Sequence, residues 1–402
     1  MPMNVELDPK TVHIINDTDS YKHCFEQLRK AKEVAVDTES DSLFVYYEKV
    51  CLIQISAEGQ SYVIDPLETG DLSSLNEIFA DPSILKIFHA AEYDLMCLKR
   101  DFGFEFANLF DTMVAARMLG KKEFGLGPLL ESEFGIHLDK RYQKANWGIR
   151  PLSREMLQYA VSDTRFLSEL KDKLLQELQE RGMLDMAKED FERLCRIHAA
   201  PSEPHDPVWW KVTGGVELVP SEQAALQGLC EFREKEAQLR DLPPFKILSN
   251  NALVNIVLEN PSNENSLRRL KGVGSAVVRR YGRTILDINK TWRRKKKIPQ
   301  PVLMSRPANG ILSRRERLKN WRKNAGLELD VPSDVILPRD ILEKIAETGP
   351  KNETELRDLM AELPSRYQRF GKEILDISIN ESSDDAMEAD TASGEPVLED
   401  EH

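Results

Sequence analysis

The C-terminal half of the chain repeats itself, and this duplication limits the possible folds more than any other feature. Shifted by 89 residues without gaps, residues 246–289 match residues 335–378 at sixteen of forty-four positions. About three identities are expected from composition alone, so coincidence does not explain the match. Because both copies show helical periodicity, they predict two small all-α domains, at residues 222–290 and 314–380.

Prolines and shifts of charge divide the remaining chain. Prolines, glycines and two tryptophans interrupt the helical pattern after an N-terminal domain of residues 1–200, so we expect a linker at 201–221. A basic segment with prolines, residues 291–313, joins the two helical copies. Residues 381–402 contain nine acids and no Lys or Arg. This composition predicts a disordered acidic tail.

The N-terminal domain alternates short β-branched runs with helical stretches. The runs predict four strands, at residues 33–39, 51–56, 61–65 and 85–88. We expect the first three strands to form an antiparallel meander, and helices at 72–80 and 91–101 to cover the sheet. Helical periodicity continues from 111 to 198, with Pro128 and Pro151 expected in the first turns of helices. The pattern therefore predicts an α/β domain with a mixed sheet and flanking helices.

Four acids and one tyrosine in this domain have the chemistry of a two-metal phosphodiesterase. Asp37 and Glu39 are two residues apart on an expected strand, which places them on one face. Tyr159 and Asp163 are four residues apart and share one face of an expected helix. Mg²⁺ and Mn²⁺ prefer carboxylate oxygens, and two such ions roughly 3.5–4 Å apart balance the charge of phosphodiester hydrolysis. Each short motif is common when it stands alone. Asp94, for example, could simply cap a helix. Only the ordered set of all five residues indicates a metal site.

The segments around these residues resemble the motifs of DEDD exonucleases of the tyrosine subgroup, and residues 1–200 resemble ribonuclease D. The two repeats resemble HRDC domains, most clearly at Leu242 through Leu248. The matching motifs of the first domain are Asp37-Thr38-Glu39, His89 through Asp94, Phe110 through Arg117, and Tyr159 through Asp163. The resemblance implies an α/β ribonuclease H-like exonuclease domain followed by two all-α HRDC-like domains.

The resemblance also implies an activity. It implies 3′-to-5′ hydrolysis of RNA to 5′-mononucleotides, with tRNA precursors that carry 3′ extensions as substrates and with Tyr159 positioning the attacking water. A DNA exonuclease with the same metal site and a catalytically silent nucleic-acid-binding protein are the alternatives. Asp111 matches a further family position, where a helix cap is the better interpretation. The implied ligands of two Mg²⁺ or Mn²⁺ ions are Asp37, Glu39, Asp94 and Asp163.

Cations and aromatic side chains suited to single-stranded nucleic acid occur before the last motif and in the first helical copy. A solvated loop explains the first group nearly as well, and a helix-to-helix turn explains the glycines of the second group equally well. His89 fits a packed or hydrogen-bonded histidine better than a substrate contact. The candidate RNA-contacting residues are His89, Lys140, Arg141, Lys144, Trp147, Arg150, Lys271, Gly272, Gly274, Arg279 and Arg280.

The two helical copies differ at these candidate positions. Lys271 of the first copy becomes Met360 in the second, and Arg279 becomes Gln368. The glycine turn is also missing from the second copy. We therefore expect the first copy to bind RNA and the second mainly to pack or to position.

The charge of the chain agrees with a nucleic-acid partner only when its distribution is considered. Of the net charge of −13, nine negative charges lie in the tail, which leaves −4 for the rest. Residues 266–297 contain twelve Lys and Arg and a single acid. A basic surface is therefore expected on the first copy.

The cysteines and the hydropathy of the chain predict a cytoplasmic protein. The five cysteines are scattered without a Cys-x-x-Cys pair, which is typical of reduced, buried thiols. No apolar run approaches the roughly 20 residues of a membrane helix, and the N-terminus lacks the pattern of a secretory signal. We expect a cytoplasmic protein without membrane association, and no pattern indicates an obligate protein partner.

Overall fold

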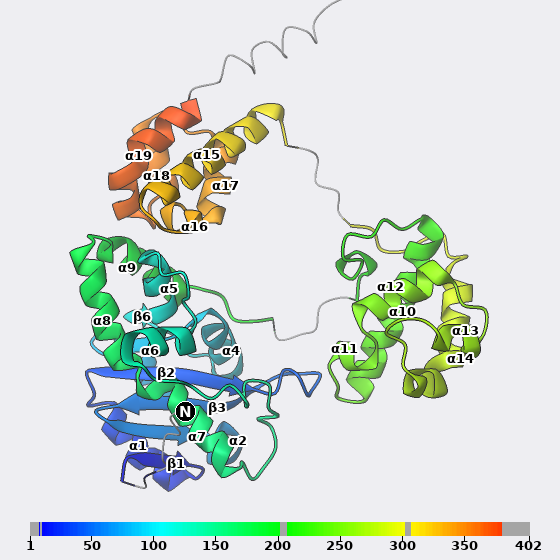
Figure 1. Ribbon diagram of the computed structural model, residues 1–402, viewed down its shortest axis with the longest axis horizontal. Helices are drawn as coiled ribbons and strands as arrows, with labels where there is room; N and C mark the ends of the chain where they lie inside the picture. The colour runs from blue at the N-terminus through cyan, green and yellow to red at the C-terminus, as the bar shows by residue number, and fades with distance from the viewer. Residues whose placement is uncertain (1–7, 9, 202–206, 302–306, 380–402) are drawn as a thin grey trace, which may run out of the picture.

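The computed structural model describes residues 8, 10–201, 207–301 and 307–379 (Figure 1). A mixed six-stranded sheet with helices on its faces forms the first part, and two helical bundles follow. The predicted fold class is therefore confirmed. The predicted tail at 381–402 lies outside the described residues. Among the described helices, none is long and apolar enough to cross a membrane.

The sheet has the strand order β1-β4-β3-β2-β5-β6. β2, β3 and β4 form the predicted antiparallel meander, while β1–β4, β2–β5 and β5–β6 pair in parallel. All four predicted strands are present, and the two edge strands β1 and β6 were not predicted. The strands are β1 Val12–Ile15, β2 Glu33–Ser40, β3 Val50–Ala57, β4 Gln60–Ile64, β5 Leu85–Phe88 and β6 Leu109–Asp111.

The β3–β4 hairpin closes at Glu58 and Gly59. Both residues have positive φ, at 49° and 75°. A two-residue turn with two positive φ angles matches the right-handed twist of the strands that it joins. This turn fixes the register in which Gln54 lies opposite Val63.

Nine helices surround the sheet within residues 10–201. One prediction about them is wrong: no helix begins at Pro151, because Ser153 accepts a hydrogen bond from the Met156 amide (3.2 Å) and so caps a helix that begins at Arg154. The helices are α1 Thr18–Leu28, α2 Pro66–Thr69, α3 Leu75–Phe79, α4 Glu92–Phe102, α5 Thr112–Met118, α6 Leu126–Phe134, α7 Arg154–Arg165, α8 Leu167–Glu180 and α9 Leu184–Cys195.

The two bundles have the same order of helices, which confirms the duplication. A 3₁₀ helix, η1 (Trp209–Lys211), precedes the first bundle, and Trp209 packs in that bundle's core. The first bundle contains α10 Pro220–Leu239, α11 Pro244–Ile247, α12 Asn250–Glu259, α13 Glu264–Arg268 and α14 Ser275–Trp292. The second contains α15 Asn309–Glu328, α16 Ser333–Ile336, α17 Arg339–Thr348, α18 Glu353–Leu359 and α19 Pro364–Ile379.

The two bundles are attached differently to the first domain. Buried side chains of the second bundle, such as Ile374, belong to the same apolar cluster as those of the sheet and its helices. The first bundle has a separate core. It meets the first domain at the loop between β2 and β3, where Tyr46 donates a hydrogen bond to Glu234 of α10 (2.5 Å). The second bundle is thus continuous with the first domain, and the first bundle lies beside it (Figure 1).

Candidate functional site

The central strand β2 carries two of the predicted acids. Val34, Ala35 and Val36 are fully buried and fix this strand in the middle of the sheet. Asp37 and Glu39 follow at alternate positions, so both project from the face that α7 covers. Burial of the preceding residues therefore determines where the two carboxylates point.

Helix α7 carries the last motif, Tyr159 and Asp163, and packs over β2. It packs on β2, β3 and β4, and a hydrogen bond between Thr164 and Ser56 of β3 (2.7 Å) ties it to the sheet. Tyr159 and Asp163 lie one turn apart on its inner side. The Tyr159 ring is 9% exposed, and its centroid lies 5.9 Å from that of Trp147. The Asp163 carboxylate is close enough to the tyrosine hydroxyl for its charge to raise the pKa of Tyr159.

Three of the carboxylates form one cluster. Carboxylate oxygens of Asp37, Glu39 and Asp163 all lie within 4.8 Å of one another. Asp94 stands in the first turn of α4, where the Thr38 hydroxyl donates a hydrogen bond to it. Its charge also acts directly on Asp37. The structure therefore brings Asp37, Glu39 and Asp163 together, with Asp94 and Tyr159 beside them.

The electrostatics of this cluster favour a bound cation. Burial raises the pKa of Asp37 and of Asp94 well above the usual range, and the neighbouring carboxylates raise them further. Burial and the same neighbours raise the pKa of Glu39. Burial raises the pKa of Asp163 to about 7. Since four half-buried, neighbouring carboxylates cannot all stay ionised without compensating charge, this donor set fits divalent cations that prefer oxygen ligands.

Asp111 has the predicted capping role. Its carboxylate accepts hydrogen bonds from the amides of Met113 and Val114 (2.8 and 3.0 Å) at the start of α5. It also accepts from the amide of Ala91, directly before α4 (2.7 Å). Asp111 thus holds the start of the helix that carries Asp94.

His89 is packed and hydrogen-bonded, as expected. Its Nδ1 lies 2.9 Å from the hydroxyl of Thr112. Burial lowers the pKa of His89, so the imidazole is neutral at physiological pH. The geometry therefore favours a structural role over a contact with substrate.

Two candidate RNA contacts between α6 and α7 are wrong. Trp147 is 1% exposed and belongs to the apolar cluster beneath α7, so it is not available to stack on a base. Arg150 makes a bidentate ion pair with Asp65 (2.5 and 2.8 Å) and donates to three carbonyls. Both residues hold the segment that leads into α7. The other candidates in this segment, Lys140, Arg141 and Lys144, are exposed.

The candidates of the first bundle lie on one exposed surface around the turn into α14. Gly272 has φ +88°, which favours glycine, and a Cβ there would lie 3.3 Å from Ala252. Gly274 directly precedes α14. A cavity of about 760 Å³ beside this helix is lined by Arg268, Arg279, Arg280 and Arg283. The exposed candidates are Lys271, Gly272, Gly274, Arg279 and Arg280.

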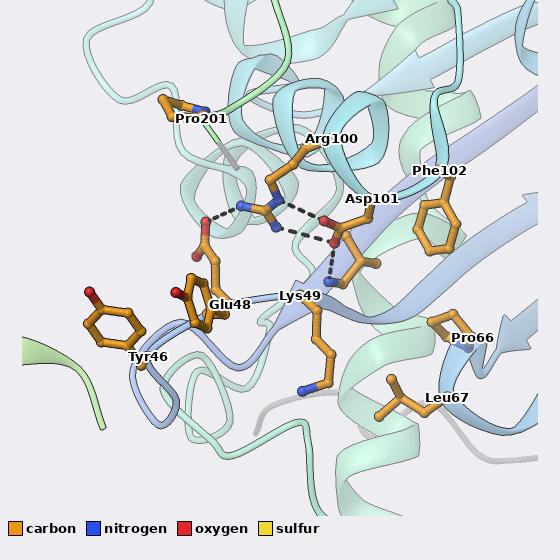
Figure 2. A pocket seen from close by; sticks show the side chains of 11 residues that line it. Tyr46, Glu48, Lys49, Pro66, Leu67, Arg100, Asp101, Phe102 and Pro201 are labelled. Carbon is orange, nitrogen blue, oxygen red and sulfur yellow. Dashed lines mark hydrogen bonds and ion pairs between the residues drawn. The ribbon is translucent and has the colours of Figure 1, made fainter. Parts of the chain in front are cut away.

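A second cavity, of about 640 Å³, lies beside the loop between β2 and β3 and does not include the metal-site residues (Figure 2). Arg100 of α4 donates to Glu48 in this loop and to Asp101 (both 2.6 Å). Asp101 in turn accepts from the amide of Val50 (2.7 Å). The cationic groups that line the cavity are therefore neutralised internally. The network braces the loop between β2 and β3, which contacts the first bundle through Tyr46, and no motif in the sequence indicated it.

Comparison with known proteins agrees with this geometry. The 3′-5′ exonuclease family profile matches residues 12–179, and the HRDC domain profile matches residues 222–288 and 312–377. Ribonuclease D of Sphingobium indicum is 30% identical over 269 residues, which are 65% of this chain and 68% of that protein. The chain belongs to the ribonuclease D family.

The solved structure of another ribonuclease D resembles this chain over most of its length. Escherichia coli RNase D, described as an exoribonuclease involved in structured RNA processing, superposes with a TM-score of 0.62 at 25% identity and covers 90% of this chain and 99% of that one. The exosome complex exonuclease RRP6 of Saccharomyces cerevisiae is 34% identical over 264 residues, 62% of this chain. The chain spans only 36% of that yeast relative.

Proposed function

We propose that this chain is a two-metal 3′-to-5′ exoribonuclease that releases 5′-mononucleotides. The observation that carries the proposal is the convergence of Asp37, Glu39 and Asp163 within 4.8 Å, with Asp94 held beside them. These four acids are the proposed ligands of two Mg²⁺ or Mn²⁺ ions. When bound, such ions would stabilise charge on the attacking and leaving oxygens of the phosphodiester.

Tyr159 is proposed to position the attacking water. Burial raises the pKa of its phenol, and the nearby carboxylates raise it further, so in the metal-free protein the hydroxyl keeps its proton at neutral pH. A protonated phenol can donate to Asp163 and accept from a water, but it is not itself a base. Its packing against Trp147 restricts the ring to one orientation.

The first bundle is proposed to bind the RNA strand leading into the site. Its exposed arginines on α14 lie beside a cavity, whereas the corresponding helix of the second bundle, α19, packs against α9 of the exonuclease domain. Val277 of the first copy corresponds to Arg366 of the second, and Arg366 is fully buried against the exonuclease domain. The two copies thus share a fold and differ in the surface that is free for RNA.

The proposed substrates are tRNA precursors with 3′ extensions, and the proposed compartment is the cytoplasm. Membership of the ribonuclease D family supports RNA as the substrate, and tRNA precursors are our proposal within that class. The compartment is supported by five free cysteines, four of them buried. No obligate protein partner is needed to complete the acidic cluster, which a single chain supplies.

Digestion of matched oligonucleotides tests the proposal. Single-stranded RNA and DNA of the same sequence, each labelled at the 5′ end, are incubated with Mn²⁺ and either wild-type protein or Asp37→Asn. The proposal predicts a ladder that shortens from the 3′ end of RNA with wild-type protein and no ladder with the variant. Faster degradation of DNA would favour a DNA exonuclease. No degradation of either strand would favour a silent binding protein.

A further inference from the structure

Gln54 of β3 lies directly opposite Asp37 of β2. The two residues are register partners in the antiparallel pair. Directly opposed residues of such a pair project from the same face, with Cβ atoms about 4.5–5.5 Å apart. The Gln54 side chain therefore shares the face of the sheet that carries the acidic cluster.

Gln54 is buried and has no hydrogen-bond partner among the described residues. It is 1% exposed, and neither its Nε2 nor its Oε1 finds a partner. An amide that is desolvated without replacement hydrogen bonds is costly, and most buried polar groups in proteins are paired. A leucine would fill the same space without this cost, so the amide requires an explanation.

The surroundings of Gln54 leave carboxylates as its natural partners. On the same strand face, Leu52 is apolar and Ser56 is already bonded to Thr164. On the other neighbouring strand, β4, Gln54 faces Val63. The layer is covered by α7, which carries Asp163, so the strand and the helix that flank Gln54 each carry an acid of the cluster.

We propose that Gln54 is a positioning residue of the metal centre, whose amide N–H donates to the Asp37 carboxylate when cations are bound. This inference rests on the proposed function. A carboxylate that binds a metal through one oxygen gains a fixed orientation when its other oxygen accepts a hydrogen bond, and such outer partners tune metal affinity. A neutral amide supplies the donor without adding a positive charge that would repel the cations.

The proposal predicts opposite effects on stability and on metal binding. Gln54→Leu removes the unpaired amide and keeps the apolar volume, so the metal-free variant should melt at the same temperature as the wild-type protein or higher. Its affinity for Mn²⁺ should fall about tenfold, because the Asp37 carboxylate loses its outer partner. If Gln54 only packed the sheet, Gln54→Leu would lower the melting temperature and leave the affinity for Mn²⁺ unchanged.

Calorimetric titration of the full chain with Mn²⁺, together with thermal unfolding in EDTA, tests this inference. Two further variants serve for comparison. Gln54→Glu places a negative charge beside the cluster. Ser56→Ala changes a residue on the same strand face that is bonded to Thr164. The expected result is weaker Mn²⁺ binding for Gln54→Leu with an unchanged or raised melting temperature, and wild-type Mn²⁺ affinity for Ser56→Ala.

The outcomes separate this inference from the proposed function. If wild-type protein binds no Mn²⁺, the metal centre itself is wrong. If wild-type protein binds Mn²⁺ and Gln54→Leu binds it within twofold as tightly, only the role of Gln54 is overturned. A Gln54→Leu variant that melts lower and binds Mn²⁺ normally would assign the residue to packing and would likewise overturn it.

Discussion

Arg366 of the second bundle is completely buried against Glu189 of the exonuclease domain, with Nη1 2.8 Å from Oε2. Its Nη2 also pairs with Asp190 at 2.7 Å, and Nε donates to a carbonyl of the bundle itself. Around this contact, Arg193 of the exonuclease domain pairs with Asp340 of the bundle. The second bundle is therefore built into the body that carries the acidic cluster.

Removing Arg366 should destabilise the whole protein. In Arg366→Ala, Glu189 remains buried without its partner, which costs about 3–5 kcal/mol. Urea unfolding measures the change, and Arg279→Ala, an exposed arginine of the first bundle, is the control that should lose less than about 0.5 kcal/mol. A loss below about 1 kcal/mol for Arg366→Ala would contradict the assigned role.

Removing the Tyr159 hydroxyl should slow turnover without weakening RNA binding. In Tyr159→Phe the ring keeps its packing against Trp147, but the group that orients the water is lost, so kcat should fall on the order of a hundredfold. Single-turnover kinetics and filter binding separate the two effects. An unchanged rate, or a loss of RNA affinity alone, would exclude the positioning role.

The metal-free protein should lose stability as pH rises. Burial raises the pKa of Asp163 to about 7, above its value in the unfolded chain, so the stability that this group contributes is complete below pH 4. That contribution disappears as pH rises through 7, a loss of a few kcal/mol. Unfolding in urea with EDTA at pH 5 and pH 8 measures it.

Two controls identify the source of this pH dependence. Mn²⁺ should restore stability at pH 8, because the cations compensate the ionised carboxylates. Asp163→Asn should reduce the dependence to the part that Asp37, Glu39 and Asp94 contribute. If the metal-free wild-type protein is equally stable at pH 5 and pH 8, the pKa of Asp163 is not raised in the folded protein.

Neutralising α14 should weaken RNA binding and its dependence on salt. The variant with both Arg279→Ala and Arg280→Ala loses two exposed charges, so the magnitude of the slope of log K against log salt should fall by about 1.4 for single-stranded RNA. The corresponding positions of the second bundle, Gln368 and Arg369, provide the matched double-alanine control. Equal weakening by both variants would refute the division of labour between the bundles.

The sequence was sufficient to predict the features that depend on local patterns. β-branched runs predicted the central strands, and alternation on β2 with four-residue spacing on α7 predicted which acids share a face. The duplication predicted two bundles of similar build. The edge strand β6 escaped prediction because its three residues are too few for a periodic signal, and β1, as short as the predicted β5, was also missed.

The errors concern residues whose partners are distant in the chain. An arginine and a tryptophan between α6 and α7 suggest RNA binding by composition, but Arg150 pairs with Asp65, 85 residues away, and Trp147 is buried. Composition cannot distinguish a phosphate from a buried aspartate as the partner of an arginine. Gln54 was not predicted for the same reason, because its proposed role depends on its pairing with Asp37 across two strands.

Anomalous diffraction from crystals soaked with Mn²⁺ and a 5′-mononucleotide shows whether the acidic cluster holds two cations. We expect two manganese peaks roughly 3.5–4 Å apart. Asp37, Glu39, Asp94 and Asp163 should surround them. No peak at this cluster, or manganese bound only elsewhere on the chain, would rule out the two-metal site.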